Sequence, residues 1–170
     1  VLAGPWAAQN LADLGAEVVK VEVPGMGDLA RQLGADPELN RRGMGASFLA
    51  QHAGKRSITL NLKSPKGREA FVRLVATSDV VVENFRPGVM DRLGLGYAAL
   101  SAANPRLIYV SLSGFGNLAP SPYASWPAYA PIGEAMGGIY EPTRKPGQPP
   151  PVVVAGALGD NTTALYAVIG

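Results

Sequence analysis

The spacing of hydrophobic and polar residues switches along the chain between a helical period and a strand period. After a Gly-Pro start, Trp6, Leu11 and Leu14 recur at helical spacing, which predicts an amphipathic helix with these three side chains turned inward. Gly15 follows as a helix end, and residues 17–22 then alternate as a strand. A helix joined to a strand by so short a turn is typical of α/β proteins.

A strand followed by a helix comes next in the pattern. Residues 55–62 alternate as a strand with apolar side chains on one face. Ser64 then stands where a helix N-cap is expected, with Pro65 at the first helical position. Phe71 lies on the apolar stripe of this helix, which we expect to extend to about residue 78. The segment therefore predicts a strand that leads directly into a helix.

Two further strands are predicted in the middle of the chain. Residues 79–85 contain a continuous apolar run, as expected for a strand at the centre of a parallel sheet, and residues 106–112 form the next strand. Short helices are predicted between them, at residues 88–93 and 97–103. The alternation predicts an α/β fold with a doubly wound parallel sheet, in which ligands bind beyond the carboxyl ends of the strands.

Some segments do not follow this alternation. Residues 23–48 are rich in glycine and charge, and their length leads us to expect that they are either disordered or functional. Residues 114–138 have the composition of a loop followed by a helix, and residues 141–156 that of a proline-rich surface crossing. The final residues, 159–170, have the pattern of a helix start with Asp160 at its head.

Composition narrows the classes of function. The chain has 170 residues, 47% of them apolar, which is enough for one globular domain with a packed core. Charged residues make up 16% of the chain and the net charge is only +2, without a basic block, so we expect no nucleic-acid partner. The longest apolar runs fall short of the roughly 18 residues that span a bilayer, so we expect no membrane association.

Cysteine and histidine are too scarce for the common metal sites. The sequence has no cysteine, which excludes thiolate ligands, and its single histidine, His52, excludes a multi-histidine cage. We therefore expect no metal. Because His52 stands alone in a predicted loop, we expect it to be a surface or packing residue. The absence of cysteine is compatible with a reducing cytoplasm, which is the location we expect.

The sequence also lacks the two commonest phosphate-binding loops. No P-loop occurs, and the glycine pattern of dinucleotide-binding folds does not follow the first strand, where residues 25–27 are only a weak echo of it. A nicotinamide dinucleotide or ATP site is therefore disfavoured. A serine hydrolase is disfavoured as well, because no G-x-S-x-G segment is present.

Asp160 has two interpretations, and both can hold at once. As an acid at the start of a helix, it can satisfy unpaired backbone N–H groups of the first turn. As a nucleophile, it would gain from the same position, because a helix N-terminus favours the ionised carboxylate and nearby N–H groups can stabilise an oxyanion. Asn84 and Phe85 can likewise either close a strand or contact a ligand, and Arg92 can be a surface residue or bind phosphate.

Several segments taken together identify a family resemblance that runs over nearly the whole chain in unbroken order. The segments are AGPWAAQNLADLGAEVVKVE, GDLAR, GKRSITLNLKSPKGREAF, VVVENFRPGVMDRLGLGYAALSAANPRLIYVSLSGFG and GALGDNTTAL. They resemble the family III CoA transferases, a group that includes formyl-CoA:oxalate and carnitine CoA transferases and the α-methylacyl-CoA racemases. The VENFRPG and GD segments are its specific signatures.

The resemblance implies a reaction and the residues that carry it. The acid of the GALGD segment, Asp160, matches the family's nucleophile, which attacks an acyl-CoA thioester to give a mixed anhydride and then an aspartyl-CoA thioester. CoA finally passes to a carboxylic acid, so acyl-CoA is a substrate and no tightly bound cofactor is expected. The family's CoA contacts fall on Ala3, Leu60, Asn84, Phe85 and Arg92.

The chain departs from the family pattern at two cationic positions. Val23 stands where some transferases have an arginine, and Pro127 where some have a lysine. Part of the phosphate contact must therefore come from other cations, and Arg31 and Lys55 are kept as candidates from a set that also includes Arg41, Arg42 and Arg56.

Two alternatives remain open at this stage. The racemase branch carries a His-Asp dipeptide that works with an acid at the Asp160 position, but this chain has Ala128 and Tyr129 there, which favours a transferase. The other alternative is a catalytically degenerate domain that binds CoA without turnover.

The resemblance also bears on domain organisation. We expect residues 1–170 to be an incomplete N-terminal Rossmann-like CoA-binding domain, truncated at both ends, with the family's small domain and C-terminal part absent. The chain opens at Val1 without an initiator methionine and stops within a helical pattern. The resemblance implies an interlocked homodimer for the full-length protein, and we expect this piece to be inactive by itself.

Overall fold

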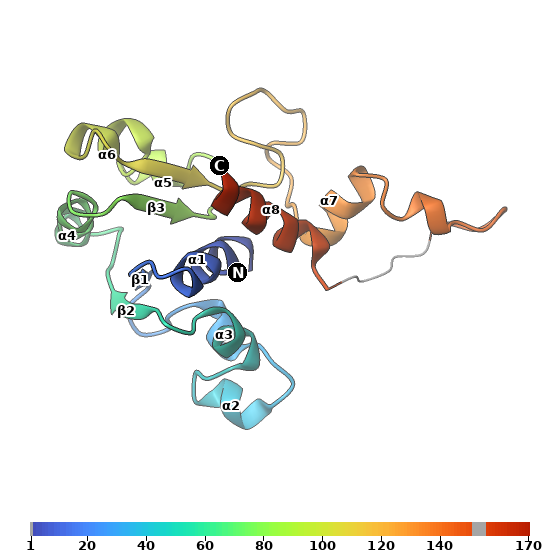
Figure 1. Ribbon diagram of the computed structural model, residues 1–170, viewed down its shortest axis with the longest axis horizontal. Helices are drawn as coiled ribbons and strands as arrows, with labels where there is room; N and C mark the ends of the chain where they lie inside the picture. The colour runs from blue at the N-terminus through green and yellow to red at the C-terminus, as the bar shows by residue number, and fades with distance from the viewer. Residues whose placement is uncertain (1, 151–155) are drawn as a thin grey trace.

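A computed structural model describes residues 2–150 and 156–170 and has an α/β architecture of short parallel strands and helices (Figure 1). The strands are β1 (Val19–Glu22), β2 (Arg56–Thr59), β3 (Val80–Glu83) and β4 (Ile108–Ser111). The helices are α1 (Ala3–Asp13), α2 (Pro37–Arg41), α3 (Ala46–Gln51), α4 (Pro65–Val75), α5 (Val89–Arg92), α6 (Tyr97–Ala103), α7 (Ala130–Met136) and α8 (Leu158–Ile169), with 3-10 turns η1 (Leu29–Gln32) and η2 (Glu141–Thr143).

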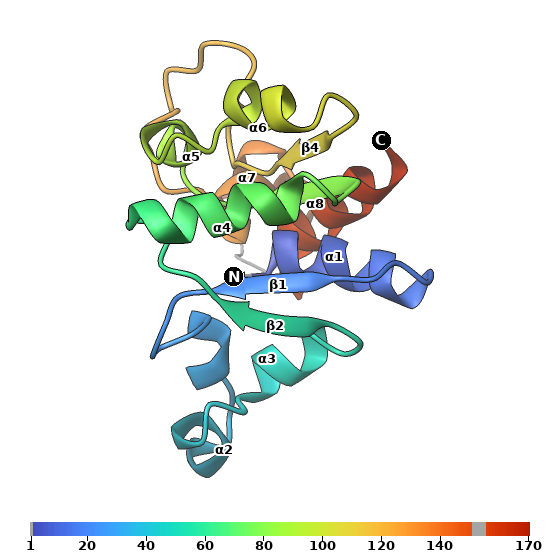
Figure 2. The same cartoon turned by 90° about the vertical axis from the view of Figure 1, so that its left-hand side faces the viewer.

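All four strands pair in parallel, as predicted. In the described part of the chain they form two separate two-stranded sheets, with Val19 opposite Arg56 in the first and Val80 opposite Ile108 in the second. Helix α1 lies between the two sheets and α8 runs beside it (Figures 1 and 2). The predicted α/β class is confirmed, and the carboxyl ends of β3 and β4 meet close to both helices.

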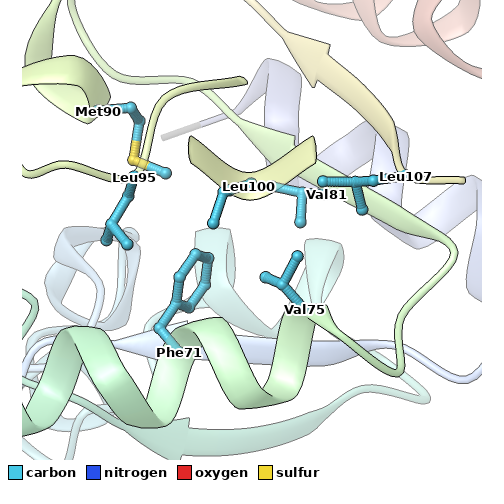
Figure 3. Packing of buried hydrophobic residues seen from close by; sticks show 7 residues of the cluster. All are labelled: Phe71, Val75, Val81, Met90, Leu95, Leu100 and Leu107. Atoms are coloured by element: carbon cyan, nitrogen blue, oxygen red, sulfur yellow. The ribbon is translucent and has the colours of Figure 1, made fainter. Parts of the chain in front are cut away.

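The hydrophobic core lies where α4 and α6 pack on the β3–β4 sheet (Figure 3). Phe71 and Val75 of α4 are four residues apart, which places them on the same face of the helix, toward Val81 and Leu100. Leu100 is completely buried, and burial of a leucine side chain contributes about 2 kcal/mol. The predicted cap is present as well, since the Ser64 hydroxyl accepts a hydrogen bond from the Gly67 N–H.

Of the two expectations for residues 23–48, disorder is wrong, because the segment contains η1, α2 and the first half of α3. Aspartates cap two of these short helices. The Asp28 side chain accepts from the Ala30 N–H, and the Asp36 side chain accepts from the N–H groups of Glu38 and Leu39. These caps order a segment whose glycine content suggested a loop.

Some expectations about apolar side chains are wrong in detail. Leu14 is 78% exposed, because α1 ends at Asp13 and Gly15 turns the chain with a φ of 101°. Strand β2 is shorter than predicted, and its Ile58 is exposed; Leu60, beyond the strand, packs against the core instead. Hydrophobic spacing predicts which side chains are buried only within the actual bounds of a helix or strand, and these two elements end earlier than predicted.

The predicted proline-rich crossing at residues 141–156 lies partly outside the described residues. Within the described ranges, no helix combines the length and the apolar character needed to cross a membrane.

Candidate active site

Asp160 lies where the N-termini of two helices meet. It belongs to the first turn of α8, and its Oδ1 accepts a hydrogen bond of 3.2 Å from the backbone N–H of Ala3, the first residue of α1. Each helix N-terminus carries a partial positive charge and unpaired N–H groups, so both ends favour a carboxylate at this point. The first interpretation needs correction, because the carboxylate satisfies an N–H group of α1 and not one in the first turn of its own helix, α8. The same hydrogen bond holds the carboxylate in one orientation, which the second interpretation requires.

A small pocket of about 120 Å³ opens beside Asp160. Its walls come from the starts of α1 and α8, the segments after β3 and β4, and helix α7. They are formed by Ala3, Asn84, Leu112, Ser113, Gly114, Ala128, Tyr129, Ala130, Gly133, Gly159, Asp160 and Thr163. The structure thus brings together three of the residues singled out in the sequence, Ala3, Asn84 and Asp160.

Asn84 fixes one wall of this pocket. Its Nδ2 donates to the carbonyl oxygen of Leu112 at 2.9 Å, which ties the end of β3 to the end of β4. A Cβ placed on Gly4 would lie 3.0 Å from the Asn84 Cβ, so the glycine lets α1 approach the strand end closely. The side chain of Asn84 therefore acts as a brace between α1 and the two strands.

Ser113 is a pocket residue for which the sequence pattern predicts no role. Its Oγ is buried and has no hydrogen-bond partner among the described residues, although it lines the pocket with Asp160. A buried hydroxyl without a partner is costly, so it is suited to a ligand's polar atom. Its position two residues after the end of β4 is the signal that could have identified it, because ligands gather at the carboxyl ends of parallel strands.

Glu134 of α7 is a second residue for which the sequence pattern predicts no role. It is 3% exposed, its Oε1 accepts from the Gly159 N–H at 3.2 Å, and its Oε2 accepts from the Tyr140 hydroxyl. The hydrogen bonds from Tyr140 and from the backbone at the start of α8 lower the pKa of Glu134. No local motif predicts this role, since its partner Gly159 lies 25 residues away.

Phe85, Arg92 and Leu60 do not line the pocket with Asp160. Phe85 follows β3 and is 48% exposed as a residue, and its backbone N–H donates to Glu83. Arg92 is exposed at the end of α5, and Leu60 is half-buried just after β2. A ligand that contacts these residues and also Asp160 must therefore be long.

Arg31 is engaged inside the fold. Its guanidinium donates to both carboxylate oxygens of Glu22, at 2.7 and 2.6 Å, and lies 3.8 Å from the centre of the Phe48 ring. The hydrogen bonds from Arg31 are the largest cause that lowers the pKa of Glu22 to about 2. Arg31 also borders a second, more open cavity of about 740 Å³ beside the carboxyl ends of β1 and β2, together with Arg41 and Arg42.

Lys55 is also engaged inside the fold. Its ammonium donates to the carbonyl oxygens of Pro5 and Gln51, at 2.7 and 2.6 Å. Burial is the main reason why the pKa of Lys55 is lowered to about 8, and the charge of Lys20 adds to it. Through these two hydrogen bonds the Lys55 ammonium links the end of α3 to the start of α1.

His52 is a packing residue, and the alternative expectation of a surface position is wrong. It is 8% exposed at the end of α3, with its ring 4.4 Å from that of Phe48. Burial, together with the charges of Lys20 and Lys55, lowers the pKa of His52 to about 4, so the ring is neutral at pH 7. Across residues 2–150 and 156–170, no group of three or more His, Cys, Asp or Glu residues is placed to hold a metal ion.

Comparison with known proteins adds a family to this geometry. The model of CoA-transferase family III matches residues 1–170. The chain belongs to this family. The family III resemblance inferred from the VENFRPG and GD segments is thereby confirmed.

Curated relatives of family III match along the whole chain. The acetyl-CoA:oxalate CoA-transferase of Acetobacter aceti is 45% identical over 170 residues, which is 100% of this chain and 42% of that protein. The succinyl-CoA–D-citramalate CoA-transferase of Chloroflexus aurantiacus is 44% identical and is matched over 99% of this chain and 40% of its own length. The chain thus spans about two fifths of these relatives.

Solved structures share the fold of this chain. A CAIB/BAIF family protein from Brucella suis superposes with a TM-score of 0.87 at 45% identity, over 99% of this chain and 44% of that protein. This agreement supports the arrangement of α1, β3, β4 and α8 around Asp160.

Proposed function

We propose that the protein is a CoA transferase that moves CoA from an acyl-CoA thioester to a carboxylic acid, with Asp160 as the nucleophile. The observation that carries the proposal is the Asp160 carboxylate, held by the Ala3 N–H in a pocket at the ends of two parallel strands. A carboxylate is a weak nucleophile, so it needs a fixed orientation and nearby donors for the charge that develops. Both features are present at this pocket.

The proposed reaction begins when an Asp160 oxygen attacks the thioester carbonyl carbon. The carbon–sulfur bond breaks, which gives a mixed anhydride and CoA thiolate. The thiolate then attacks the Asp160 carbonyl carbon and displaces the original acid as its carboxylate, which leaves an aspartyl-CoA thioester. No proton is gained or lost in these steps.

The second half of the reaction reverses the first with a new acid. The acceptor carboxylate attacks the aspartyl-CoA thioester, expels CoA thiolate and forms a second mixed anhydride. The thiolate attacks the acceptor's carbonyl carbon, which releases the new acyl-CoA and restores the Asp160 carboxylate. When thiolate or the acceptor carboxylate attacks the Asp160 carbonyl carbon, the Ala3 N–H is placed to stabilise the oxyanion that forms on Asp160.

CoA binding is proposed to use Ala3, Leu60, Asn84, Phe85 and Arg92. Arg92 is exposed, so its guanidinium is accessible to a phosphate, and the half-exposed Phe85 ring can pack against an apolar part of CoA. Arg31 and Lys55 stay candidates, although their hydrogen bonds to Glu22 and to backbone carbonyls leave them less available. We also propose that the chain is part of an interlocked, cytoplasmic homodimer.

The racemase alternative requires a second acid/base group opposite Asp160. Ala128 and Tyr129 stand at the positions of the racemase His-Asp dipeptide, and both line the pocket. Because Ala128 has only a methyl side chain, it cannot move a proton. A transferase is therefore favoured.

The test uses the protein expressed from its complete coding sequence. CoA transfer from acetyl-CoA and succinyl-CoA to a panel of carboxylic acids is measured for the wild type, Asp160→Ala and Asp36→Asn. We expect Asp160→Ala to lose about 10³-fold or more in kcat, as nucleophile deletions do. Asp36→Asn changes an aspartate at another helix start and keeps the cap, so its rate should stay within about twofold of the wild type.

Three outcomes would reject the proposal. CoA transfer at the wild-type rate by Asp160→Ala would show that Asp160 is not the nucleophile. Reaction in D2O that places deuterium at the α-carbon of the acyl-CoA, without transfer of CoA to any acid, would identify a racemase. CoA binding without either reaction would instead identify the degenerate domain.

A further inference from the structure

Helix α8 begins without a capping side chain of its own. Its N-cap residue is Ala157, which has a φ of 57° and a ψ of 49° and provides no side-chain hydrogen bond. Among the described residues Ala157 is the one non-glycine residue with a positive φ, a conformation that costs on the order of 1 kcal/mol. The start of the helix that carries Asp160 therefore needs support from outside the helix.

Glu134 of the neighbouring helix α7 supplies this support. Its carboxylate accepts from the N–H of Gly159, the residue directly before Asp160, as a cap would do from within the helix. Its other oxygen accepts from the Tyr140 hydroxyl, which fixes the rotation of the carboxylate. At 3% exposed, Glu134 is shielded from water, which would otherwise compete for these bonds.

Close packing leaves little freedom for this arrangement. A Cβ on Gly159 would lie 3.4 Å from the carbonyl oxygen of Ala130, so the backbone of α8 rests directly on α7. Gly133 and Gly159 line the pocket, whereas Glu134 does not. Glu134 therefore does not touch a ligand there, and any effect on the reaction acts through the backbone before Asp160.

We propose that Glu134, fixed by Tyr140, is a positioning residue that sets the orientation of the Asp160 carboxylate toward the thioester through its hydrogen bond to the Gly159 N–H. The inference rests on the proposed function of Asp160 as nucleophile. A displacement of about 1 Å at a reacting group can cost about 100-fold in rate. Loss of the Glu134 oxygen therefore lowers kcat while the binding of acyl-CoA, made elsewhere, is kept.

The test compares Glu134→Ala, Glu134→Gln and Tyr140→Phe in the complete protein. Each variant is measured for kcat and for KM toward acyl-CoA, with rates normalised to folded protein by circular dichroism. For Glu134→Ala we expect kcat to fall by about 100-fold at a KM within about threefold of the wild type. Glu134→Gln keeps an oxygen that can accept from Gly159, so its kcat should stay within about threefold.

Tyr140→Phe keeps the ring and removes only the hydroxyl, and we expect it to lower kcat about tenfold without a change in KM. This variant carries the test if Glu134→Ala does not fold. An unchanged kcat in folded Glu134→Ala or in Tyr140→Phe would overturn the inference, as would a loss in Glu134→Gln equal to that in Glu134→Ala.

Asp160→Ala separates the two proposals. If Asp160→Ala is inactive while Glu134→Ala turns over normally, only the positioning role is wrong. If Asp160→Ala transfers CoA at the wild-type rate, both the proposed function and the positioning role of Glu134 are wrong.

Discussion

The backbone N–H of Ala3 donates a hydrogen bond to the carboxylate of Asp160 across a separation of 157 residues. This contact joins the first and last helices, which lie side by side in the molecule (Figure 2). A backbone donor cannot change its rotamer, so its direction is set by the packing of α1. The geometry at Asp160 therefore depends on residues that hold α1 against the ends of the strands, and these residues can be tested.

Substitution of Gly4 by alanine should disturb this packing. The added Cβ would meet the Asn84 Cβ at 3.0 Å, and overpacking of this kind costs about 1–3 kcal/mol. Gly133→Ala is the matched control, since the new methyl group in α7 would have no neighbour within 4 Å. Alanine should stabilise that helix by up to about 1 kcal/mol. Urea unfolding of both variants checks the prediction, and equal stability of the two would contradict it.

The buried ion pair between Glu22 and Arg31 should contribute more to stability than an exposed one. Glu22 is 5% exposed and accepts from Arg31, Ser57 and the Asp28 N–H. We expect Glu22→Gln to lower the free energy of unfolding by about 3 kcal/mol, because the guanidinium loses its anionic partner.

The exposed pair of Glu17 and Arg56 provides the control for Glu22→Gln. Their side chains are 81% and 75% exposed, so Glu17→Gln should change the free energy of unfolding by less than about 0.5 kcal/mol. Denaturant titrations at neutral pH measure both variants. If Glu17→Gln lowered the free energy of unfolding as much as Glu22→Gln does, the larger contribution of the buried ion pair would be contradicted.

Acid should destabilise the fold through His52 before the carboxylates are protonated. Burial lowers the pKa of His52 from 6.5 to about 4, so between these values the unfolded chain binds a proton that the folded chain does not. The stability from the neutral ring is complete above pH 6.5 and is lost as the pH falls toward 4. The loss is about 3 kcal/mol.

A variant without the imidazole separates His52 from other titrating groups. His52→Gln should remove most of the stability change between pH 6.5 and 4, measured by urea midpoints at several pH values. Below pH 4 the stability of both proteins should still fall as the pH falls, because hydrogen bonds from Arg31 lower the pKa of Glu22 to about 2. A wild-type midpoint that does not change between pH 6.5 and 4 would show that His52 titrates normally.

Arg92 should contribute to the binding of CoA and not to the chemical step. It is exposed and lies outside the pocket with Asp160, so Arg92→Gln should raise KM for acyl-CoA about tenfold, with kcat nearly unchanged. Arg73→Gln removes another exposed arginine, one paired with Glu69 on α4, and serves as the control. Steady-state kinetics of the two variants decide whether Arg92 binds phosphate.

The regular elements were predictable because their signals are local. Ser64 and Pro65 fix the start of α4, and helix α6 has the predicted bounds, 97–103. The segment at residues 23–48 was misjudged because its order depends on aspartate caps and on the buried pair of Glu22 and Arg31. An ion pair between residues nine positions apart leaves no helical or strand periodicity in the sequence.

The site residues also fall into those that sequence segments identify and those that depend on tertiary packing. Asp160, Ala3 and Asn84 were identified through family segments, and the structure brings them to one pocket. Glu134 was missed because its role comes from the packing of α7 on α8, which sequence patterns do not encode. Lys55 was proposed for its charge, but its hydrogen bonds to Pro5 and Gln51 are only visible in three dimensions.

The most direct test of the account is to capture the bond that Asp160 is proposed to form. The complete protein is incubated with acyl-CoA, treated with hydroxylamine and digested, and the peptide that contains Asp160 is examined by mass spectrometry. The account predicts a hydroxamate on Asp160 that appears only when acyl-CoA is present. An unmodified Asp160 in protein that transfers CoA at its full rate would contradict it.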